Sequence, residues 1–318
     1  MRVVVTGGAG FIGSTLVDVL VAAGHTVHVV DNLSSGSRAN LAEATANAGD
    51  RLVLHELDVR AARCTDVIAE LAPEVVFHLA AQIDVRVSVQ QPVLDAEINI
   101  LGSLRVLEGA RLGGTRKVVF ASSGGTIYGE PDASVLPVDE NHPQRPVSPY
   151  GVAKKVVSDY LFAYSALHGL DFTSLALANV YGPRQDPHGE AGVVAIFCGR
   201  LLDRQECTIF GEGDQTRDFV YVGDVADAFA RAGASGVAGG LVINIGTGVE
   251  TSVNELYNAI ADAAGIDAPA NHREARAGEL QRSALSVALA AEQLGWEPST
   301  DLLSGAVATL DWFRAQRG

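Results

Sequence analysis

The sequence predicts an α/β protein with a doubly wound parallel sheet and a smaller C-terminal lobe. Three observations lead to this fold class. The chain has 318 residues, of which 47% are hydrophobic and 19% are charged, which allows a large core and exceeds one small domain. Short β-branched runs alternate with longer segments of helical apolar spacing through the first half. A glycine-rich turn directly follows the first of these runs and opens a helix.

The first half of the chain is expected to supply most strands of this sheet. Val3 to Val5 form a β-branched run typical of a buried strand, and the apolar spacing that follows is helical. Repetition of strand, helix and strand predicts parallel strands covered by helices on both faces. Strands are expected at residues 3–5, 26–30, 52–54, 75–79 and 117–121. Helices are expected at residues 11–23, 93–111 and 150–168.

The second half is more broken and predicts the smaller lobe. A polar loop at 183–192 precedes a helix, and the turn GEGDQ follows a short strand. No repeat or low-complexity linker separates the halves, so we expect the lobe to be formed by returns of the same chain. Strands are expected here at residues 208–210 and 241–245, and helices at residues 284–294 and 303–314.

The composition narrows the classes of function. The formal charge of −15 argues against a nucleic-acid partner, because such proteins normally present a basic face to phosphates. No run of 18 apolar residues appears, which argues against a membrane span. Cys64, Cys198 and Cys207 show no CxxC pairing and predict free thiols in a reducing compartment. The chain opens with strand-like MRVVVTGG and not with a leader, so we expect a cytoplasmic protein.

Gly7-x-x-Gly10-x-x-Gly13 follows the first strand and opens the first helix. Without side chains, the backbone turns tightly and approaches a pyrophosphate at the helix N-terminus. The pattern alone also fits a plain turn, but its context favours a Rossmann-type dinucleotide site. Asp31 closes the second strand, where a carboxylate accepts hydrogen bonds from ribose hydroxyls and repels a 2′-phosphate. This favours NAD over NADP, although the nearby Arg38 would weaken the preference.

Tyr150 and Lys154 predict acid–base chemistry. At positions i and i+4 of a helix, the phenol and the ammonium share one face. A tyrosine with a pKa of about 10 is a poor base at neutral pH. A neighbouring ammonium and a positive nicotinamide ring both favour the phenolate and lower that pKa. The alternative is an ordinary exposed pair, and the dinucleotide motif upstream argues against it.

Taken together, the motifs resemble those of the extended short-chain dehydrogenase/reductases from residue 2 to about residue 312. They appear in order as Asp58-Val59, His78-Leu79-Ala80-Ala81-Gln82, Asn99, Ser122-Ser123-Gly124-Gly125-Thr126-Ile127-Tyr128-Gly129 and Tyr150-Gly-Val-Ala-Lys154. The resemblance implies a tightly bound NAD. The cofactor-binding residues that it implies are Gly7, Gly10, Phe11, Ile12, Gly13, Asp31, Asn32, Asp58, Val59, Leu79, Ala80, Ala81, Gln82, Asn99, Ser122, Tyr150 and Lys154.

The segment after the fifth predicted strand distinguishes reactions within this superfamily. Sugar-nucleotide 4,6-dehydratases carry an Asp-Glu pair where this chain has Gly125-Thr126, and UDP-glucuronate decarboxylases carry a glutamate at the Thr126 position. The chain instead resembles the UDP-glucose (UDP-galactose) 4-epimerases, which need a base, a hydroxyl donor and NAD. Tyr150 would take the proton of the sugar O4, with Lys154 beside it, while C4 gives a hydride to NAD. The 4-keto sugar would then turn, and the hydride would return to its opposite face.

Residues further along the chain resemble the part of these epimerases that binds the nucleotide. Arg217 and Arg276 match the two arginines that clamp the diphosphate, and a fork of donors suits phosphate oxygens. Arg273 and Arg282 are interpreted as solvated surface charges. The remaining substrate-binding residues implied by the resemblance are Ser123, Thr126, Tyr150, Asn179, Val193, Val194, Thr208 and Phe210.

Two positions depart from the family. Many epimerases have a serine at Gly124 that bonds the reacting hydroxyl, so here the hydroxyl donor would be Ser123, with Ser122 and Thr126 as alternatives. Ser283 stands where a tyrosine gates the sugar pocket in epimerases restricted to unsubstituted hexoses. A serine leaves room, which predicts that UDP-GalNAc and UDP-GlcNAc are also interconverted, unless neighbouring loops fill the space.

The chain is expected to divide into two parts, each formed by two segments. Residues 1–177 plus 216–248 form an NAD-binding Rossmann domain, and residues 178–215 plus 249–318 form a lobe that binds the nucleotide sugar. The spacing of His78, His142 and His188 suits no metal site, so no metal is expected. Helices 93–111 and 150–168 resemble those that form an intermolecular four-helix bundle in this superfamily, which implies a homodimer. The alternatives are an epimerase of UDP-uronic acids, a nucleotide-sugar keto-reductase and a non-catalytic NAD-binding protein.

Overall fold

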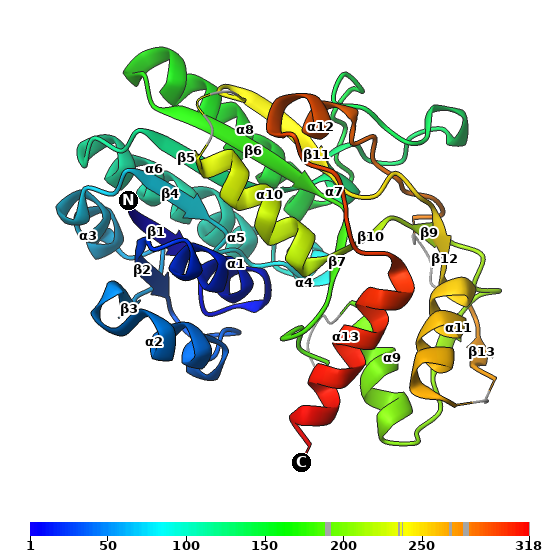
Figure 1. Ribbon diagram of the computed structural model, residues 1–318. Helices are drawn as coiled ribbons and strands as arrows, with labels where there is room; N and C mark the ends of the chain where they lie inside the picture. Colours follow the sequence, from blue (N-terminus) through cyan, green and yellow to red (C-terminus); the bar gives the residue numbers. More distant parts are fainter. Residues whose placement is uncertain (188–191, 235, 237, 267–268, 276–279, 318) are drawn as a thin grey trace.

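The computed structural model describes residues 1–187, 192–234, 236, 238–266, 269–275 and 280–317 (Figure 1). Its centre is a seven-stranded sheet in the order β11-β6-β5-β4-β1-β2-β3, in which all neighbouring strands are parallel. The predicted parallel sheet is therefore confirmed. Its strands are β1 (Arg2–Thr6), β2 (Thr26–Asp31), β3 (Leu52–Glu56), β4 (Val75–His78), β5 (Lys117–Ser123), β6 (Asp171–Leu177) and β11 (Leu241–Ile245).

The chain winds outward in two directions from the middle of this sheet. It runs from β1 through β2 to β3 at one edge, returns to β4 beside β1, and continues to β11 at the other edge. The reversal lies between β1 and β4. Ligands of open parallel sheets bind outside the carboxyl ends of the strands at such a point. The topology alone therefore places a binding crevice beyond Thr6 and His78.

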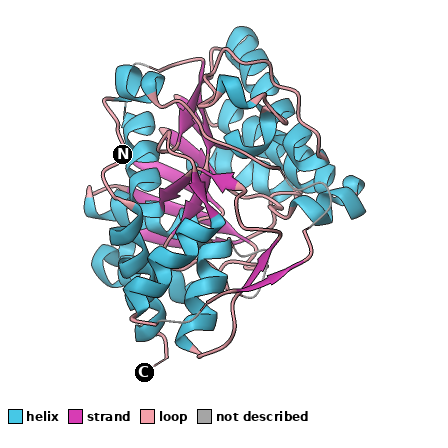
Figure 2. Cartoon of the chain, turned by 90° about the vertical axis from the view of Figure 1, so that its right-hand side faces the viewer, coloured by secondary structure: helices cyan, strands magenta, loops and turns pink. Residues whose placement is uncertain are grey.

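Alternate residues of the strands pack against helices on opposite faces of the sheet, which lies between two helical layers (Figure 2). Val3 and Val5 of β1 belong to one buried cluster, and Val4 between them belongs to another. The first face is covered by α1 (Phe11–Ala22), α2 (Ala42–Ala48), α10 (Val222–Ala234) and α12 (Ala288–Leu294). The second face is covered by α3 (Ala62–Leu71), α6 (Gly102–Leu112) and α8 (Pro149–His168).

A separate buried cluster forms the core of the smaller lobe, with Phe197, Leu256 and Leu310 among its members. The helices of this cluster are α9 (Val193–Leu202), α11 (Val253–Ala264) and α13 (Leu302–Ala315), which lie together in Figure 1. Three short strand pairs complete the lobe: β7 (Asn179–Tyr181) with β10 (Phe219–Tyr221), β8 (Thr208–Phe210) with β13 (Asn271–Arg273), and β9 (Thr216–Arg217) with β12 (Thr251–Ser252). The domain boundaries themselves stay a prediction.

Three of the differences from the sequence-based expectation have a clear physical reason. Strand β6 was not expected, because the polar Thr173 and Ser174 interrupt its apolar run; both are buried and hydrogen-bonded to Ala238 O and Ser158 Oγ. The helix expected at 284–294 begins only at Ala288, since Leu285 forms a parallel bridge with Val138. The helix expected at 93–111 is divided into α5 (Pro92–Ala96), a π-helical turn (Glu97–Leu101) and α6.

Short elements connect these layers. They are α4 (Val85–Gln90), α7 (Gly124–Ile127) and the 3₁₀ turns Arg38–Leu41, Gly49–Arg51 and Ala133–Val135. Within the described parts of the chain, no helix is both long and apolar enough to cross a membrane.

Candidate active site

The structure has two neighbouring cavities of interest. One lies at the carboxyl ends of the sheet strands, and the other lies in the smaller lobe. The first, of about 500 Å³, is lined by the glycine turn, by residues that follow β2, β3 and β4, and by Tyr150 and Lys154 of α8. The second, of about 530 Å³, is lined by β7, β8 and α9 of the smaller lobe. Most of the functional residues predicted from the sequence line one or the other of these two cavities.

The glycine turn forms one wall of the first cavity. Gly7 has a φ of +69°, and a Cβ atom at this residue would lie 2.7 Å from the Ala80 amide nitrogen. A Cβ atom on Gly13 would collide with the carbonyl of Gly7. Only glycine therefore permits this close approach of the β1 end to the start of α1, which begins at Phe11. The result is a helix N-terminus that faces an open cradle, the geometry that suits a pyrophosphate.

Carboxylates line the side of this cavity formed by β2 and β3. Asp31 is buried and accepts hydrogen bonds from the amides of Ala9 at 2.9 Å and Leu33 at 2.8 Å. Asp58 accepts hydrogen bonds from Arg60 and Asn32, and the bonds from Arg60 are the main cause that holds the pKa of Asp58 at about 2. Both groups are placed to accept hydrogen bonds from hydroxyl or amino groups of a ligand.

Arg38 does not line this cavity. Its guanidinium instead donates a hydrogen bond to exposed Glu56 at 2.6 Å. The ion pair engages Arg38 outside the cavity, so Arg38 itself is not placed to attract a 2′-phosphate beside Asp31. The expected preference for NAD is thereby strengthened.

Asn99 supports the cavity from behind and does not line it. This buried side chain accepts a hydrogen bond from the Gln82 amide at 2.8 Å and donates to the Gln82 carbonyl at 2.9 Å. It also donates to buried Asp95. These bonds fix the segment of residues 79–82, whose members do line the cavity. All other predicted cofactor-binding residues line it as well.

His78 is another buried supporting residue. Its Nδ1 lies 2.7 Å from Thr6 Oγ1 and its Nε2 lies 2.8 Å from Ser103 Oγ. Burial is the main cause that lowers the pKa of His78 to about 3, so the ring is neutral at physiological pH. The imidazole therefore joins β1, β4 and α6 as an uncharged hydrogen-bonding group. Within the described ranges, no group of three or more His, Cys, Asp or Glu side chains is arranged to hold a metal ion.

Tyr150 and Lys154 lie at the junction of β5 and α8, as the helical spacing predicts. Pro149 stands at the helix start and Ser148 caps it, since its Oγ accepts a hydrogen bond from the Gly151 amide. The buried Lys154 ammonium donates to the Ala121 carbonyl at 2.8 Å and lies 5.6 Å from the centre of the Tyr150 ring. Tyr150 and Ser123 are joined by a side-chain hydrogen bond.

The pKa values of this pair differ from the sequence-based expectation. Burial raises the pKa of Tyr150 to about 12, and the hydrogen bond with Ser123 opposes this only in part. Burial also lowers the pKa of Lys154 to about 8, opposed by the charge of Asp95. The sequence predicts that the ammonium and a nicotinamide ring together lower the pKa of the phenol. In the structure the ammonium donates to the Ala121 carbonyl, and burial keeps the pKa of Tyr150 raised. The remaining expected contribution is the positive charge of a nicotinamide ring.

The other candidate hydroxyls occupy different environments. Ser122 lines the first cavity, and its buried Oγ has no hydrogen-bond partner among the described residues. Thr126 Oγ1 donates to the Ser123 carbonyl at 3.3 Å. A polar atom left unpaired at a cavity wall is what a ligand with its own donors or acceptors would satisfy. The glycine cradle, Asp31 and Ser122 together fit a dinucleotide.

Gly124 packs closely against a buried leucine. A Cβ atom at this residue would collide with Leu285 Cδ1 and would lie 3.0 Å from the Ala176 carbonyl oxygen. Leu285 is buried in a small cluster with Ile127 and Val138. Leucine packing therefore occupies the volume that a serine side chain at position 124 would need. Ser283, two residues before Leu285, is buried and lines neither cavity.

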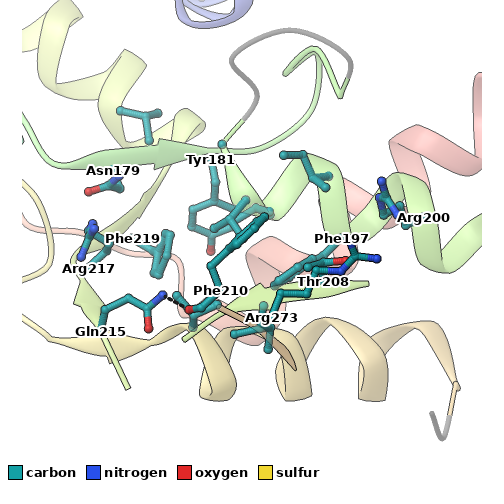
Figure 3. Close-up of a pocket in the computed structure, with 17 residues that line it drawn as sticks. Asn179, Tyr181, Phe197, Arg200, Thr208, Phe210, Gln215, Arg217, Phe219 and Arg273 are labelled. Atoms are coloured by element: carbon teal, nitrogen blue, oxygen red, sulfur yellow. Dashed lines mark hydrogen bonds between the residues drawn. The ribbon is translucent and has the colours of Figure 1, made fainter. Parts of the chain in front are cut away.

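The second cavity combines aromatic side chains with cationic ones (Figure 3). Phe197, Phe210 and Phe219 present apolar surface, and the side-chain Nε2 of Gln215 donates to the Phe210 carbonyl at 3.0 Å. Arg217 donates to the Thr216 carbonyl at 2.8 Å. The predicted substrate-binding residues that line this cavity are Asn179, Val193, Val194, Thr208, Phe210 and Arg217. Ser123 and Thr126 do not line it.

Sequence reasoning missed two arginines of this cavity. Arg273, interpreted from the sequence as a solvated surface charge, lines it because β13 pairs with β8 and sets Arg273 opposite Phe210. Arg200 of α9 lines it as well. Arg282 does lie at the surface, in an ion pair with Glu250. Arg276, the second arginine predicted to clamp the diphosphate, lies outside the described residues.

Comparison with known proteins gives consistent results. The model of the NAD dependent epimerase/dehydratase family matches residues 3–246. A UDP-glucose 4-epimerase of Mycolicibacterium smegmatis is 50% identical over 314 residues, which cover 99% of both chains. The crystal structure of UDP-glucose 4-epimerase with UDP-glucose from Thermotoga maritima superposes with a TM-score of 0.94, at 43% identity over 100% of both chains. The crystal structure of the Thermus thermophilus UDP-glucose 4-epimerase in complex with NAD superposes with a TM-score of 0.89, at 43% identity over 99% of both chains.

Proposed function

This chain belongs to the NAD dependent epimerase/dehydratase family, and we propose that it interconverts UDP-galactose and UDP-glucose with NAD as a tightly held cofactor. The observation that carries the proposal is the hydrogen-bonded pair of Tyr150 and Ser123 beside the first cavity. Gly125 and Thr126 supply no carboxylate for elimination or decarboxylation. The relatives that match the whole chain are named as UDP-glucose 4-epimerases, which supports the same reaction.

The first cavity would hold the cofactor. The glycine turn and the start of α1 suit its pyrophosphate, and Asp31 suits the hydroxyls of its adenosine ribose. Asp58 and the segment of residues 79–82 would complete the pocket, with Ser122 offering its unpaired hydroxyl. When bound, NAD supplies the acceptor and donor of the hydride at C4 of the sugar.

The residues around Tyr150 would handle the proton. Tyr150 accepts the proton of the sugar 4-hydroxyl as its general base, and returns it when the sugar is reduced again. Ser123 holds that hydroxyl in line, a role for which its hydrogen bond with Tyr150 positions it. Lys154 keeps a positive charge beside the phenol ring and is itself fixed by the Ala121 carbonyl.

The second cavity would anchor the UDP group. Arg217 and Arg276 would bind the diphosphate, while the apolar surface around Phe210 accommodates the uridine. Asn179 lines this cavity and also approaches Gly125, so it stands between the nucleotide site and the reacting sugar. Because the nucleotide stays anchored, the 4-keto sugar can turn about the diphosphate and present either face.

The direct test is proton NMR of the anomeric region, with UDP-galactose added to purified protein and no cofactor supplied. Appearance of UDP-glucose is the expected result, and the Y150F variant should retain NAD but lose turnover. A second sample with UDP-GalNAc tests the prediction from Ser283 that N-acetyl sugars are accepted. No conversion even after NAD is added would refute the proposal. It would leave an epimerase of UDP-uronic acids, a keto-reductase or a non-catalytic NAD-binding protein.

The assembly and location of the protein form part of the proposal. Exposed apolar side chains gather on the elements from α4 to α6 and on α8, namely Val89, Val93, Leu101, Val152 and Phe162. A second copy of the chain would cover this face in a homodimer. Light scattering of the V93K variant should then show monomers where the natural protein forms dimers. The free thiols of all three cysteines suit the reducing cytoplasm.

A further inference from the structure

One short connection touches both cavities. It leaves β7, whose Asn179 and Tyr181 line the cavity proposed for UDP, and continues through residues 182–187. Arg184, Gln185 and Asp186 of this connection line the other cavity, the one proposed for NAD. A segment that belongs to the smaller lobe therefore forms part of the wall around the dinucleotide.

Arg184 anchors this connection to the helix that follows the glycine turn. Its Nη1 donates to Asp18 Oδ2 of α1 at 2.5 Å, and its Nη2 lies 3.8 Å from Glu43 Oε2 of α2. The pair is poorly exposed, with 15% of the Arg184 side chain and 28% of the Asp18 side chain accessible. Such shielding makes a charged hydrogen bond stronger than one at the open surface.

The backbone of Arg184 adopts a conformation that is unfavourable for this residue type. Its φ of +70° lies in the left-handed region, which arginine rarely occupies. Contacts must therefore hold the residue there, and the ion pair with Asp18 is the strongest described contact of its side chain. At the next residue, the side-chain Nε2 of Gln185 donates to the Val180 carbonyl and links the connection back to β7.

We propose that Arg184 is a retention residue for the dinucleotide, because its ion pair with Asp18 holds the connection 182–187 across the edge of the first cavity. The inference rests on the proposed function, in which NAD stays bound through both hydride transfers. For NAD to leave, the connection must move, and the ion pair must break first. Arg184 thereby slows release of NAD without contacting the reacting sugar.

The rate of NAD release can be measured directly. Bound NAD is exchanged for isotopically labelled NAD, and native mass spectrometry of the holoenzyme follows the exchange. R184G removes the guanidinium and also relieves the backbone, and D18N removes the partner charge with little change of shape. Each should speed exchange about tenfold to hundredfold, the range expected for loss of a hydrogen bond between charged groups. The matched control is R204G, since exposed Arg204 also has a positive φ, of 54°, and lines neither cavity.

The double variant separates a specific pair from general loosening. If the ion pair acts as a unit, R184G/D18N should exchange no faster than either single variant. Exchange at the natural rate in both single variants, additive acceleration in the double variant, or equal acceleration in R204G would each overturn the inference. Failure of the natural protein to hold NAD at all would instead refute the proposed function, so the two failures are distinguishable.

Discussion

Replacing Gly124 by the serine found in many related epimerases should damage this protein rather than improve it. The new Cβ atom would collide with Leu285 Cδ1 and meet the Ala176 carbonyl at 3.0 Å. The Ala176 carbonyl belongs to β6, which is paired on both sides with β5 and β11 and is therefore held in place, so Leu285 must move. Leu285 is itself 1% exposed and packed against Ile127 and Val138. Overpacking of this kind costs about 2 kcal/mol.

The G124S variant should therefore lose about 5 °C in melting temperature, a shift typical of that cost in a chain of this size. Melting is followed by circular dichroism at one fixed saturating concentration of NAD, because bound ligand alone raises the midpoint. Turnover of UDP-galactose should not rise in G124S, since Ser123 already supplies the hydroxyl beside Tyr150.

A second substitution decides whether the collision is the cause. L285A alone should cost about 3 kcal/mol as a buried large-to-small change. In G124S/L285A the shortened side chain leaves room for the serine, so the double variant should be at least about 1 kcal/mol more stable than the sum predicts. Additive losses, or a G124S protein as stable as the natural one, would refute the packing argument.

Three further outcomes are expected. S123A should lower kcat about a hundredfold with little change in KM, measured with UDP-galactose, whereas unchanged kcat would assign the hydroxyl to Ser122 or Thr126. His78 has a pKa of about 3 when folded and binds a proton below about 6.5 when unfolded, so the free energy of unfolding should fall as the pH falls from 6.5 towards 3. In urea titrations at several pH values, the slope of the unfolding free energy against pH should be smaller in H78Q than in the natural protein, by up to about 1.4 kcal/mol per pH unit. D218N should destabilise the protein by about 3 kcal/mol in the same titrations. Buried Asp218 accepts hydrogen bonds from the backbone amides of Thr247, Gly248 and Leu285, and the side-chain NH₂ of an asparagine would face at least one of these donors. A loss below about 1 kcal/mol would contradict this reasoning.

The parts of the fold that follow local rules could be predicted from the sequence. The glycine turn, the spacing of Tyr150 and Lys154, and the carboxylate at the end of β2 each depend on a few neighbouring residues. Backbone geometry then decides the outcome, because a helix places i and i+4 together and a tight turn excludes side chains. The cofactor cavity is lined as expected for this reason, with Asn99 as the exception.

The parts that depend on distant pairings could not be predicted in the same way. Arg273 enters the second cavity only because β13 aligns with β8, some sixty residues earlier in the chain. Leu285 lies outside the helix that was expected to contain it, because it forms a β-bridge with Val138. The polar Thr173 and Ser174 hide β6 in the sequence, since their hydrogen-bond partners lie far away in the chain: Ser158 in α8 and Ala238 in the connection before β11. In each case the deciding contact leaves no pattern in the local sequence.

The site of Tyr150 shows how burial changes a conclusion drawn from residue types alone. A lysine four residues after a tyrosine suggests an acidified phenol, yet the same packing that brings them together removes both from water. Desolvation disfavours the charged form of each group, so it raises the pKa of Tyr150 and lowers that of Lys154. The neutral phenol is then the resting form, and it ionises only when further positive charge reaches the ring. In the proposed function, this coupling of base strength to the positive charge would keep Tyr150 from acting on a sugar that has no hydride acceptor beside it.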